Sequence, residues 1–206
     1  QRHSVELACR MRVREAIAAQ NPLWAQRLGA DTLLDLDIFR QLADTALTSD
    51  TPIDEHGANG LPNTFVPGRN LIFILHAASW AYAKEIRHIV LGVCQSDYSG
   101  YPDCRDDSIK AMQVAVNSGM DAQYTLHTPL MWRSKKDAWM LARELGGDAL
   151  VNLIVEESHT CYMGQRGQRE PWGYGCGTCP ACRLRAAGYA AYVQALAGLG
   201  QDSPKG

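Results

Sequence analysis

The sequence predicts an α/β protein built on a doubly wound parallel sheet. Short apolar stretches at 32–38, 89–93 and 124–127 have the length and composition of strands. Longer stretches at 4–17, 71–84, 106–118, 134–145 and 183–197 carry apolar residues on one side or throughout, as helices do. Strands that alternate with helices favour a parallel sheet with helices on both faces. Ligands of such sheets bind beyond the carboxyl ends of the strands.

Local signals support the helix boundaries around residue 140. Ser134 is predicted as an N-cap with Asp137 in the first turn of the helix that follows. Gly146-Gly147 is expected to end that helix, because glycine is favoured just beyond a helix C-terminus.

Composition and charge describe an ordinary globular protein. With 46% hydrophobic and 20% charged residues among 206, we expect an α/β body at 1–150 and a smaller module at 151–206. The net charge of -2 gives no electrostatic reason to expect a nucleic-acid partner. No apolar run approaches the ~20 residues of a membrane span, and no signal peptide is visible. We therefore expect a cytoplasmic protein with reduced thiols.

Four of the seven cysteines, Cys161, Cys176, Cys179 and Cys182, form a CxxCxxC motif with one cysteine upstream. Thiolates three residues apart on a tight turn can converge on one tetrahedral cation, and the upstream thiolate completes the shell. A redox pair and an iron–sulfur cluster are alternatives, because clusters also use such spacing. We favour structural zinc, since a filled four-thiolate shell leaves no open position for catalysis. The remaining cysteines are expected to be free thiols.

A dense polar segment follows the predicted strand 89–93, where a ligand site is expected. Two aromatic rings and fixed carboxylates there could sandwich and hydrogen-bond a flat heterocycle. The candidate binding residues are Asp97, Tyr98, Ser99, Tyr101 and Asp103. The alternative is an ordinary polar loop in which Asp103 or Asp106 caps a helix.

Two predicted helix N-termini carry cations. Pro67-Gly68 forms a turn that leaves Arg69 and Asn70 where free N–H groups and a guanidinium suit a phosphate or carboxylate. Lys135 lies at the start of a second helix, where a cation is unfavourable unless an anion is near. In both cases the alternative is a solvated side chain at a helix start.

Several stretches together resemble one family. They are Gln1 to Leu7, Leu61 to Asn70, the segment DYSGYPDCR at 97–105, His127 to Leu130, Cys161-Tyr162 and the segment CGTCPACRLRAAG at 176–188. In this order they are similar to the QueC family of 7-cyano-7-deazaguanine synthases, and the resemblance spans essentially the whole chain.

The resemblance implies a PP-loop, adenine nucleotide α-hydrolase-like fold and an ATP-dependent ligase. Such an enzyme converts 7-carboxy-7-deazaguanine and ammonia to the 7-cyano base for queuosine in tRNA, through an adenylated carboxylate and an amide. It further implies one zinc on Cys161, Cys176, Cys179 and Cys182, ATP with Mg²⁺, and a homodimer. By position, Asp97, Tyr98, Ser99, Tyr101 and Asp103 would line the base pocket. Arg69 and Asn70 would face the substrate carboxylate or a phosphate, and Lys135 a phosphate.

The chain departs from the family pattern at its beginning. The pyrophosphate-binding Ser-Gly-Gly-x-Asp-Ser loop of the family is not in this sequence, which starts at Gln1 rather than Met. We therefore expect the remainder of a longer chain, inactive without that loop. The arm at 165–174 is expected to be an insertion. Alternative functions are a zinc-ribbon module that binds tRNA or protein without catalysis, and a PP-loop relative with another substrate.

Overall fold

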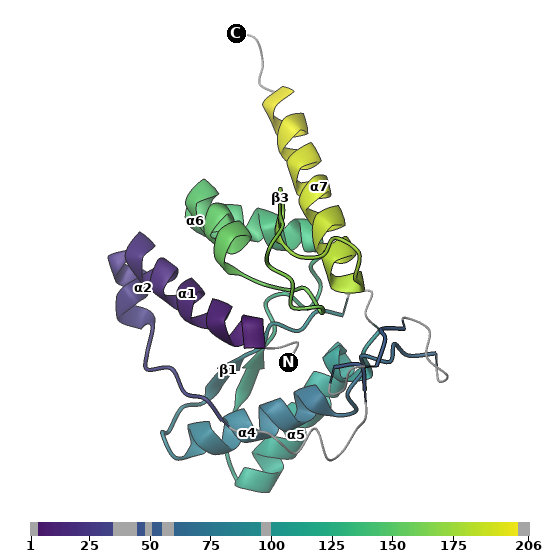
Figure 1. Ribbon diagram of the computed structural model, residues 1–206. Coiled ribbons are helices and arrows are strands. Elements are labelled where there is room, and N and C mark those ends of the chain that lie inside the picture. The colour runs from purple at the N-terminus through teal and green to yellow at the C-terminus, as the bar shows by residue number, and fades with distance from the viewer. Residues whose placement is uncertain (1–3, 35–44, 48–50, 55–59, 96–99, 202–206) are drawn as a thin grey trace. The chain divides into compact units, whose positions relative to one another are not determined.

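The computed structural model describes residues 4–34, 45–47, 51–54, 60–95 and 100–201 (Figure 1). Its contacts divide the chain into two compact units. The first unit is Gln1–Asp35 with Ser134–Gly206, and the second unit is Leu36–Arg133. The boundary expected after residue 150 falls inside a helix, Lys135–Glu157, and the division into 1–150 and 151–206 stays a prediction.

The second unit carries the parallel strands. Its elements are α4 (Arg69–Tyr82), β1 (His88–Val90), the 3₁₀ helix η1 (Pro102–Cys104), α5 (Asp106–Met120) and β2 (Thr125–His127). β1 and β2 pair in parallel, with Ile89 opposite Leu126 (Figure 1). The helices predicted at 71–84 and 106–118 and the strands predicted at 89–93 and 124–127 are therefore present, with the strands shifted or shortened by a few residues.

One core holds the second unit together. Ile74 and Ala78 of α4 and Ile109 and Val116 of α5 join Ile89 in a single buried cluster. In β1 the buried Ile89 stands between exposed neighbours, because successive side chains point to opposite faces of a strand. The parallel sheet in the described residues thus has two strands with one packed face. The sequence predicted a larger sheet covered on both faces.

The strand predicted at 32–38 is absent from residues 32–34, the part of it that the structure describes. Residues 32–34 have no regular secondary structure and are exposed, and residues 35–38 lie outside the described part of the chain. Leu33 and Leu34 supplied the apolar pattern for this prediction, but both side chains face solvent in the structure. An apolar run predicts a strand only where the rest of the fold buries it.

Helices dominate the first unit. They are α1 (Ser4–Gln20), α2 (Pro22–Arg27), α6 (Lys135–Glu157) and α7 (Pro180–Gln201), and between α6 and α7 lies the short hairpin β3 (Arg169–Glu170) and β4 (Gly173–Tyr174). Ser134 accepts a hydrogen bond from Asp137 N–H while Asp137 accepts one from Ser134 N–H, so the predicted N-cap of α6 is confirmed as a capping box.

The helix predicted to end near Gly146 resumes and continues to Glu157. Gly146 and Gly147 have non-helical backbone angles and divide α6 into two segments. Gly147 has φ of +62°, a conformation that glycine adopts without strain. A Cβ on Gly146 would lie 2.8 Å from the Trp24 ring, so glycine also permits close packing with α2. The pair breaks the helix locally, as predicted, without ending it.

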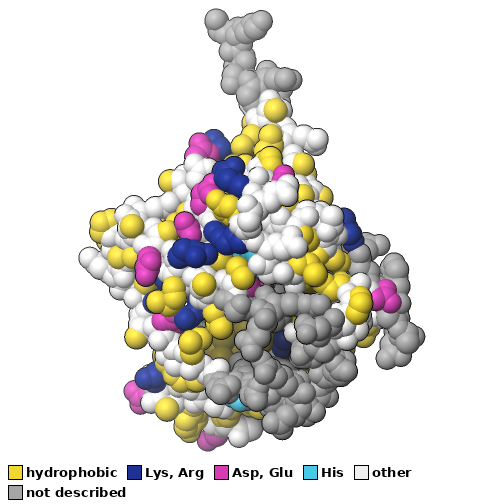
Figure 2. Space-filling model, viewed as in Figure 1, with side chains coloured by type: hydrophobic (Ala, Val, Ile, Leu, Met, Phe, Trp, Pro, Cys, Tyr) yellow, Lys and Arg dark blue, Asp and Glu magenta, His cyan; other side chains and the backbone are white. Residues whose placement is uncertain are grey.

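α6 and α7 pack through aromatic side chains. Trp139 of α6 meets Tyr189 edge-on and stacks with Tyr192, both on α7. α7 begins at Pro180, three residues before the predicted start, so Cys182 lies within the helix. Among the described helices, none combines the length and hydropathy that crossing a bilayer needs. On the visible face, basic and acidic side chains are interspersed among apolar ones (Figure 2).

Candidate functional site

The four cysteines of the CxxCxxC motif and its upstream partner converge in the first unit. The sulfur atoms of Cys161, Cys176, Cys179 and Cys182 all lie within 4.8 Å of one another, and those of Cys176 and Cys182 are 3.9 Å apart. A tetrahedral zinc with Zn–S bonds of about 2.3 Å holds its sulfurs about 3.8 Å apart. All four thiols are free of disulfides. The donor set and its spacing therefore fit a four-thiolate zinc.

Local backbone geometry orients the sulfur of Cys176. Gly177 has φ of +72°, and the turn it makes lets Cys179 N–H donate to Cys176 Sγ at 3.2 Å. Thr178 Oγ1 donates to the same sulfur at 3.4 Å. Burial opposes ionisation, but the hydrogen bonds from Thr178 and backbone amides outweigh it and lower the pKa of Cys176 to about 6.

The remaining thiols of the motif are harder to ionise in the absence of a cation. Burial raises the pKa of Cys179, and burial together with the neighbouring Cys179 raises the pKa of Cys182. A divalent cation reverses this preference, since a coordinated thiol is deprotonated outright. Space around Cys182 is also limited, because a Cβ on Gly175 would lie 2.6 Å from its sulfur.

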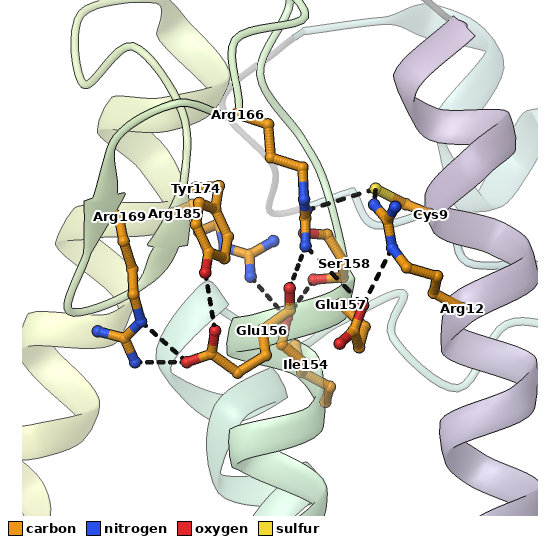
Figure 3. Close-up of polar contacts among 10 residues, drawn as sticks. All are labelled: Cys9, Arg12, Ile154, Glu156, Glu157, Ser158, Arg166, Arg169, Tyr174 and Arg185. Atoms are coloured by element: carbon orange, nitrogen blue, oxygen red, sulfur yellow. Dashed lines mark hydrogen bonds and ion pairs between the residues drawn. The ribbon is translucent and has the colours of Figure 1, made fainter.

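The arm between Cys161 and Cys176 is tied to α6 and α1 through Arg166 (Figure 3). The Arg166 guanidinium lies 4.4 Å from the centroid of the Tyr174 ring and donates to Ser158 O at 3.2 Å. Its Nη1 lies 3.4 Å from the sulfur of buried Cys9. Arg12, also on α1, reaches the same sulfur at 3.0 Å. No sequence pattern indicated this cluster, because Arg166 and Cys9 lie 157 residues apart in the chain.

A second set of contacts holds the hairpin of the arm (Figure 3). Arg169 donates to Glu156 Oε1 at 2.9 Å, and Tyr174 Oη donates to Glu156 Oε2 at 3.1 Å. The hydrogen bond from Arg169 is the main reason why the pKa of Glu156 lies below its ordinary value; the bond from Tyr174 also lowers it, while burial acts against both. The arm is thus fixed to the end of α6 by charge-assisted hydrogen bonds.

In the second unit, four of the predicted pocket residues gather at the N-terminus of α4. Asp103 is 5% exposed, and its Oδ2 accepts a hydrogen bond from Asn70 N–H at 2.8 Å. Asn70 Nδ2 donates to Cys104 Sγ at 3.3 Å. The Arg69 guanidinium lies 5.9 Å from the centroid of the Tyr101 ring. Asp103 and Asn70 are 33 residues apart in sequence, and the hydrogen bond between the Asp103 carboxylate and the Asn70 backbone N–H brings them together.

Two features of this group could not be read from the sequence. Tyr101 is buried and shares a 2.5 Å hydrogen bond with Thr64 Oγ1, and Phe65 lies against the Tyr101 ring with centroids 5.7 Å apart. Asp103 caps α4 with one oxygen, whereas its buried Oδ1 has no hydrogen-bond partner among the described residues. The helix-capping alternative is therefore correct for one oxygen of Asp103 and leaves the other available.

Four further residues were predicted for the site. Asp97, Tyr98 and Ser99 lie outside the described residues. Lys135 is the first residue of α6 in the first unit, where its Cβ lies close to Gly188 of α7. Its placement at a helix N-terminus is as predicted, and its role toward a phosphate stays a prediction.

Comparison with known proteins decides the family. Residues 1–193 match the family model described as "Queuosine biosynthesis protein QueC". The chain is 60% identical over 195 residues to the 7-cyano-7-deazaguanine synthase of Azorhizobium caulinodans, covering 95% of this chain and 80% of the relative. It is 58% identical over 193 residues to the synthase of Nitratidesulfovibrio vulgaris (94% and 79%) and 60% identical over 189 residues to that of Alkalilimnicola ehrlichii (92% and 79%). The chain belongs to the QueC family.

QueC membership confirms the resemblance found in the sequence. The matched relatives are synthases, so this is an enzyme family, and its description places it in queuosine biosynthesis. The match also supports a PP-loop α/β fold for the chain, although the described residues show mostly helices and few strands. In this QueC chain the four-cysteine cluster could hold a metal ion, in keeping with a zinc module near the C-terminus.

Proposed function

We propose that the chain is part of an ATP-dependent enzyme that converts 7-carboxy-7-deazaguanine and ammonia to 7-cyano-7-deazaguanine. The observation that carries this proposal is the identity of 58% to 60% with relatives of that name over nearly the whole chain. The DYSGYPDCR segment and the cysteine motif, from which the family was inferred, both lie within the matched residues.

The chemistry requires two activations, because a carboxylate is a poor electrophile. Its oxygen attacks the α-phosphate of ATP, and pyrophosphate leaves. Ammonia then displaces AMP from the adenylated carboxylate to give the amide. The amide oxygen attacks the α-phosphate of a second ATP, and pyrophosphate leaves. Loss of AMP and two protons then gives the nitrile. ATP with Mg²⁺ supplies the leaving group in both halves, and the protein supplies binding and orientation.

Asp103 and Tyr101 are proposed to bind the flat base. Oδ1 of Asp103, which has no hydrogen-bond partner in the described part of the chain, is an acceptor for an N–H of the deazaguanine. An unused buried acceptor costs free energy until a donor reaches it. Tyr101 offers an aromatic face, and the hydrogen bond with Thr64 fixes its ring. Asp97, Tyr98 and Ser99, by their place in the same segment, are proposed to complete the pocket.

Arg69 is proposed to face the substrate carboxylate or a phosphate, and Lys135 a phosphate. Asn70 is proposed to face the same group as Arg69. Its backbone N–H donates to Asp103 and its Nδ2 donates to Cys104, so it also positions these two residues. The zinc is structural and would be held by Cys161, Cys176, Cys179 and Cys182, since four thiolates leave no position for a substrate. The homodimer and the cytoplasmic location remain expectations.

The proposal is tested by following ATP consumption. Residues 1–206 contain no Ser-Gly-Gly-x-Asp-Ser segment, so the assay uses the chain preceded by the loop-bearing segment of a relative, and the 206 residues alone as a comparison. AMP release should require both 7-carboxy-7-deazaguanine and ammonia, and the 206 residues alone should release none. Asp97→Ala should abolish nitrile formation and keep the zinc content. Equal AMP release with and without 7-carboxy-7-deazaguanine would reject the proposed substrate.

A further inference from the structure

Arg185 is a buried cation without a carboxylate. It lies on α7 and is 7% exposed. Its Nε donates to Trp172 O at 2.8 Å, its Nη2 donates to Ile154 O at 2.9 Å, and its guanidinium lies 5.4 Å from the centroid of the Trp139 ring. Within the described part of the chain, no aspartate or glutamate forms an ion pair with Arg185. Burial lowers the pKa of this guanidinium to about 10.

Such a group needs an explanation, because buried charges in proteins are paired with an opposite charge or bound to a metal. Two carbonyl oxygens accept hydrogen bonds from Arg185 and a ring face lies near its guanidinium, but these groups carry no net negative charge. By contrast, Arg166, Arg169 and Arg12 in the same unit each reach Glu156 or Glu157.

The four-cysteine cluster lies one helical turn away. Cys182 precedes Arg185 by three residues on α7, so both side chains belong to one side of the helix. Trp172, whose carbonyl binds Arg185, is buried in one cluster with Cys161, Cys179 and Cys182. The cluster is therefore a source of negative charge close to this cation.

The charge of the cluster depends on the metal. Four thiolates around a divalent cation carry a net charge of -2. We propose that Arg185 is the charge partner of the metal-bound thiolates and a positioning residue of the metal site. Without metal, the buried guanidinium loses this counter-charge and destabilises the fold. With metal, it stabilises the anionic cluster. This inference rests on the proposed zinc site and not on the proposed reaction.

Three variants test the role of charge. Arg185→Met removes the charge and keeps an unbranched side chain, whereas Arg185→Lys keeps the charge. Arg27→Met is the control, because Arg27 is an exposed arginine of the same unit and has the same charge. The zinc affinity of each protein is measured by competition with a chromogenic chelator, starting from the zinc-loaded chain. Unfolding midpoints are measured with zinc and after chelation.

Arg185→Met should lower zinc affinity by about 10- to 100-fold, as removal of groups that support metal ligands does. Arg27→Met should stay within about threefold, because exposed charges are screened. Arg185→Lys should lie closer to the wild type than Arg185→Met does. The chelated Arg185→Met protein should unfold no earlier than the chelated wild type, although its zinc-loaded form unfolds earlier. A residue needed only for packing would lower both midpoints.

The outcomes separate this inference from the zinc site and from the function. If the wild type binds Co²⁺ without the absorption spectrum of a cobalt ion bound by four thiolates, both the zinc site and the role of Arg185 are rejected. If the wild type binds zinc on four thiolates and Arg185→Met binds it equally well, the role of Arg185 alone is rejected. If Arg185→Lys loses as much affinity as Arg185→Met, hydrogen-bond geometry and not charge is responsible, and the proposal is again rejected. None of these outcomes depends on synthase activity.

Discussion

At the scale of single residues, Asp103 has two separate tasks. Its Oδ2 accepts a hydrogen bond from Asn70 N–H at the start of α4, and its Oδ1 is buried without a partner among the described residues. The first contact fixes the loop that carries Tyr101, and the second oxygen is free to accept from a ligand. A buried carboxylate oxygen without a donor costs free energy, so a ligand that supplies an N–H binds there favourably.

The variant Asp103→Asn tests this division. The amide retains an oxygen for Asn70 N–H but places a donor where Oδ1 accepts. We expect kcat/KM for 7-carboxy-7-deazaguanine to fall by about 10- to 100-fold, the value of a hydrogen bond to a charged group. Steady-state AMP release by the loop-bearing protein measures this. Asp107→Asn, an exposed aspartate of α5, is the control and should change little. Unchanged kcat/KM in Asp103→Asn would remove Asp103 from the pocket.

Glu156 gives a prediction about pH. Its pKa is lowered chiefly by the hydrogen bond from Arg169, from the ordinary value of 4.5. A carboxyl whose pKa is lowered by folding contributes stability above its unfolded pKa, and this contribution is lost as the pH falls through the folded pKa. Wild type should therefore lose more stability below pH 4.5 than Glu156→Gln, which has no such group to protonate.

Thermal unfolding midpoints between about pH 3 and pH 6 measure this difference. Glu144→Gln, an exposed glutamate on the same helix, serves as the control and should follow the wild-type curve. If the wild-type and Glu156→Gln curves run parallel throughout this range, the contact of Glu156 with Arg169 and Tyr174 contributes nothing to the stability of the arm.

Residue-level prediction from the sequence succeeded where the signal was local. The CxxCxxC spacing alone indicated that three thiols could converge, and the sulfur positions agree. Thr64 and Arg185 gave no such signal, because their partners are a tyrosine 37 residues away and backbone carbonyls 13 and 31 residues away. Asn70 was predicted to face a ligand, which stays a prediction, and its hydrogen bond to the thiol of Cys104 is visible only in three dimensions.

At the scale of elements, α7 offers a matched pair of glycines. A Cβ on Gly188 would lie 2.3 Å from Lys135 Cβ and 3.1 Å from Lys135 backbone carbon, so the close contact of α7 with α6 requires glycine there. A Cβ on Gly198, on the same helix, would have no atom within 4 Å.

Substitution by alanine should therefore act in opposite directions at the two positions. Gly188→Ala should destabilise by about 1–3 kcal/mol through overpacking. Gly198→Ala should stabilise by up to about 1 kcal/mol, because alanine has the higher helix propensity. Urea unfolding midpoints measure both. Equal midpoints for the two variants would contradict the close packing of α6 and α7 at Gly188.

Element types were predicted better than their extents. The apolar patterns of the sequence predicted α1, α4 and α5, and Ser134 with Asp137 predicted the start of α6. The continuation of α6 beyond Gly147 was missed, because a glycine pair that usually ends a helix here permits a kink against Trp24. The strand predicted at 32–38 was wrong for residues 32–34, since no neighbouring element buries them.

At the scale of the whole molecule, the family was predicted from the sequence more completely than the arrangement of strands and helices. Ordered motifs along the chain identified the QueC family, which the comparisons confirm. The parallel pairing of β1 and β2 agrees with an α/β class, but the described residues contain no larger parallel sheet. Strand pairing depends on segments far apart in sequence, and local periodicity alone cannot specify it.

The most direct test of the proposed function follows the nitrogen of ammonia into the product. The loop-bearing protein is incubated with 7-carboxy-7-deazaguanine, ATP, Mg²⁺ and ¹⁵N-ammonia, and the product is analysed by mass spectrometry. We predict 7-cyano-7-deazaguanine that carries one ¹⁵N in its nitrile, with no product when ATP or ammonia is omitted. Release of AMP without a nitrile product, or a product whose nitrile lacks the label, would contradict the proposed reaction.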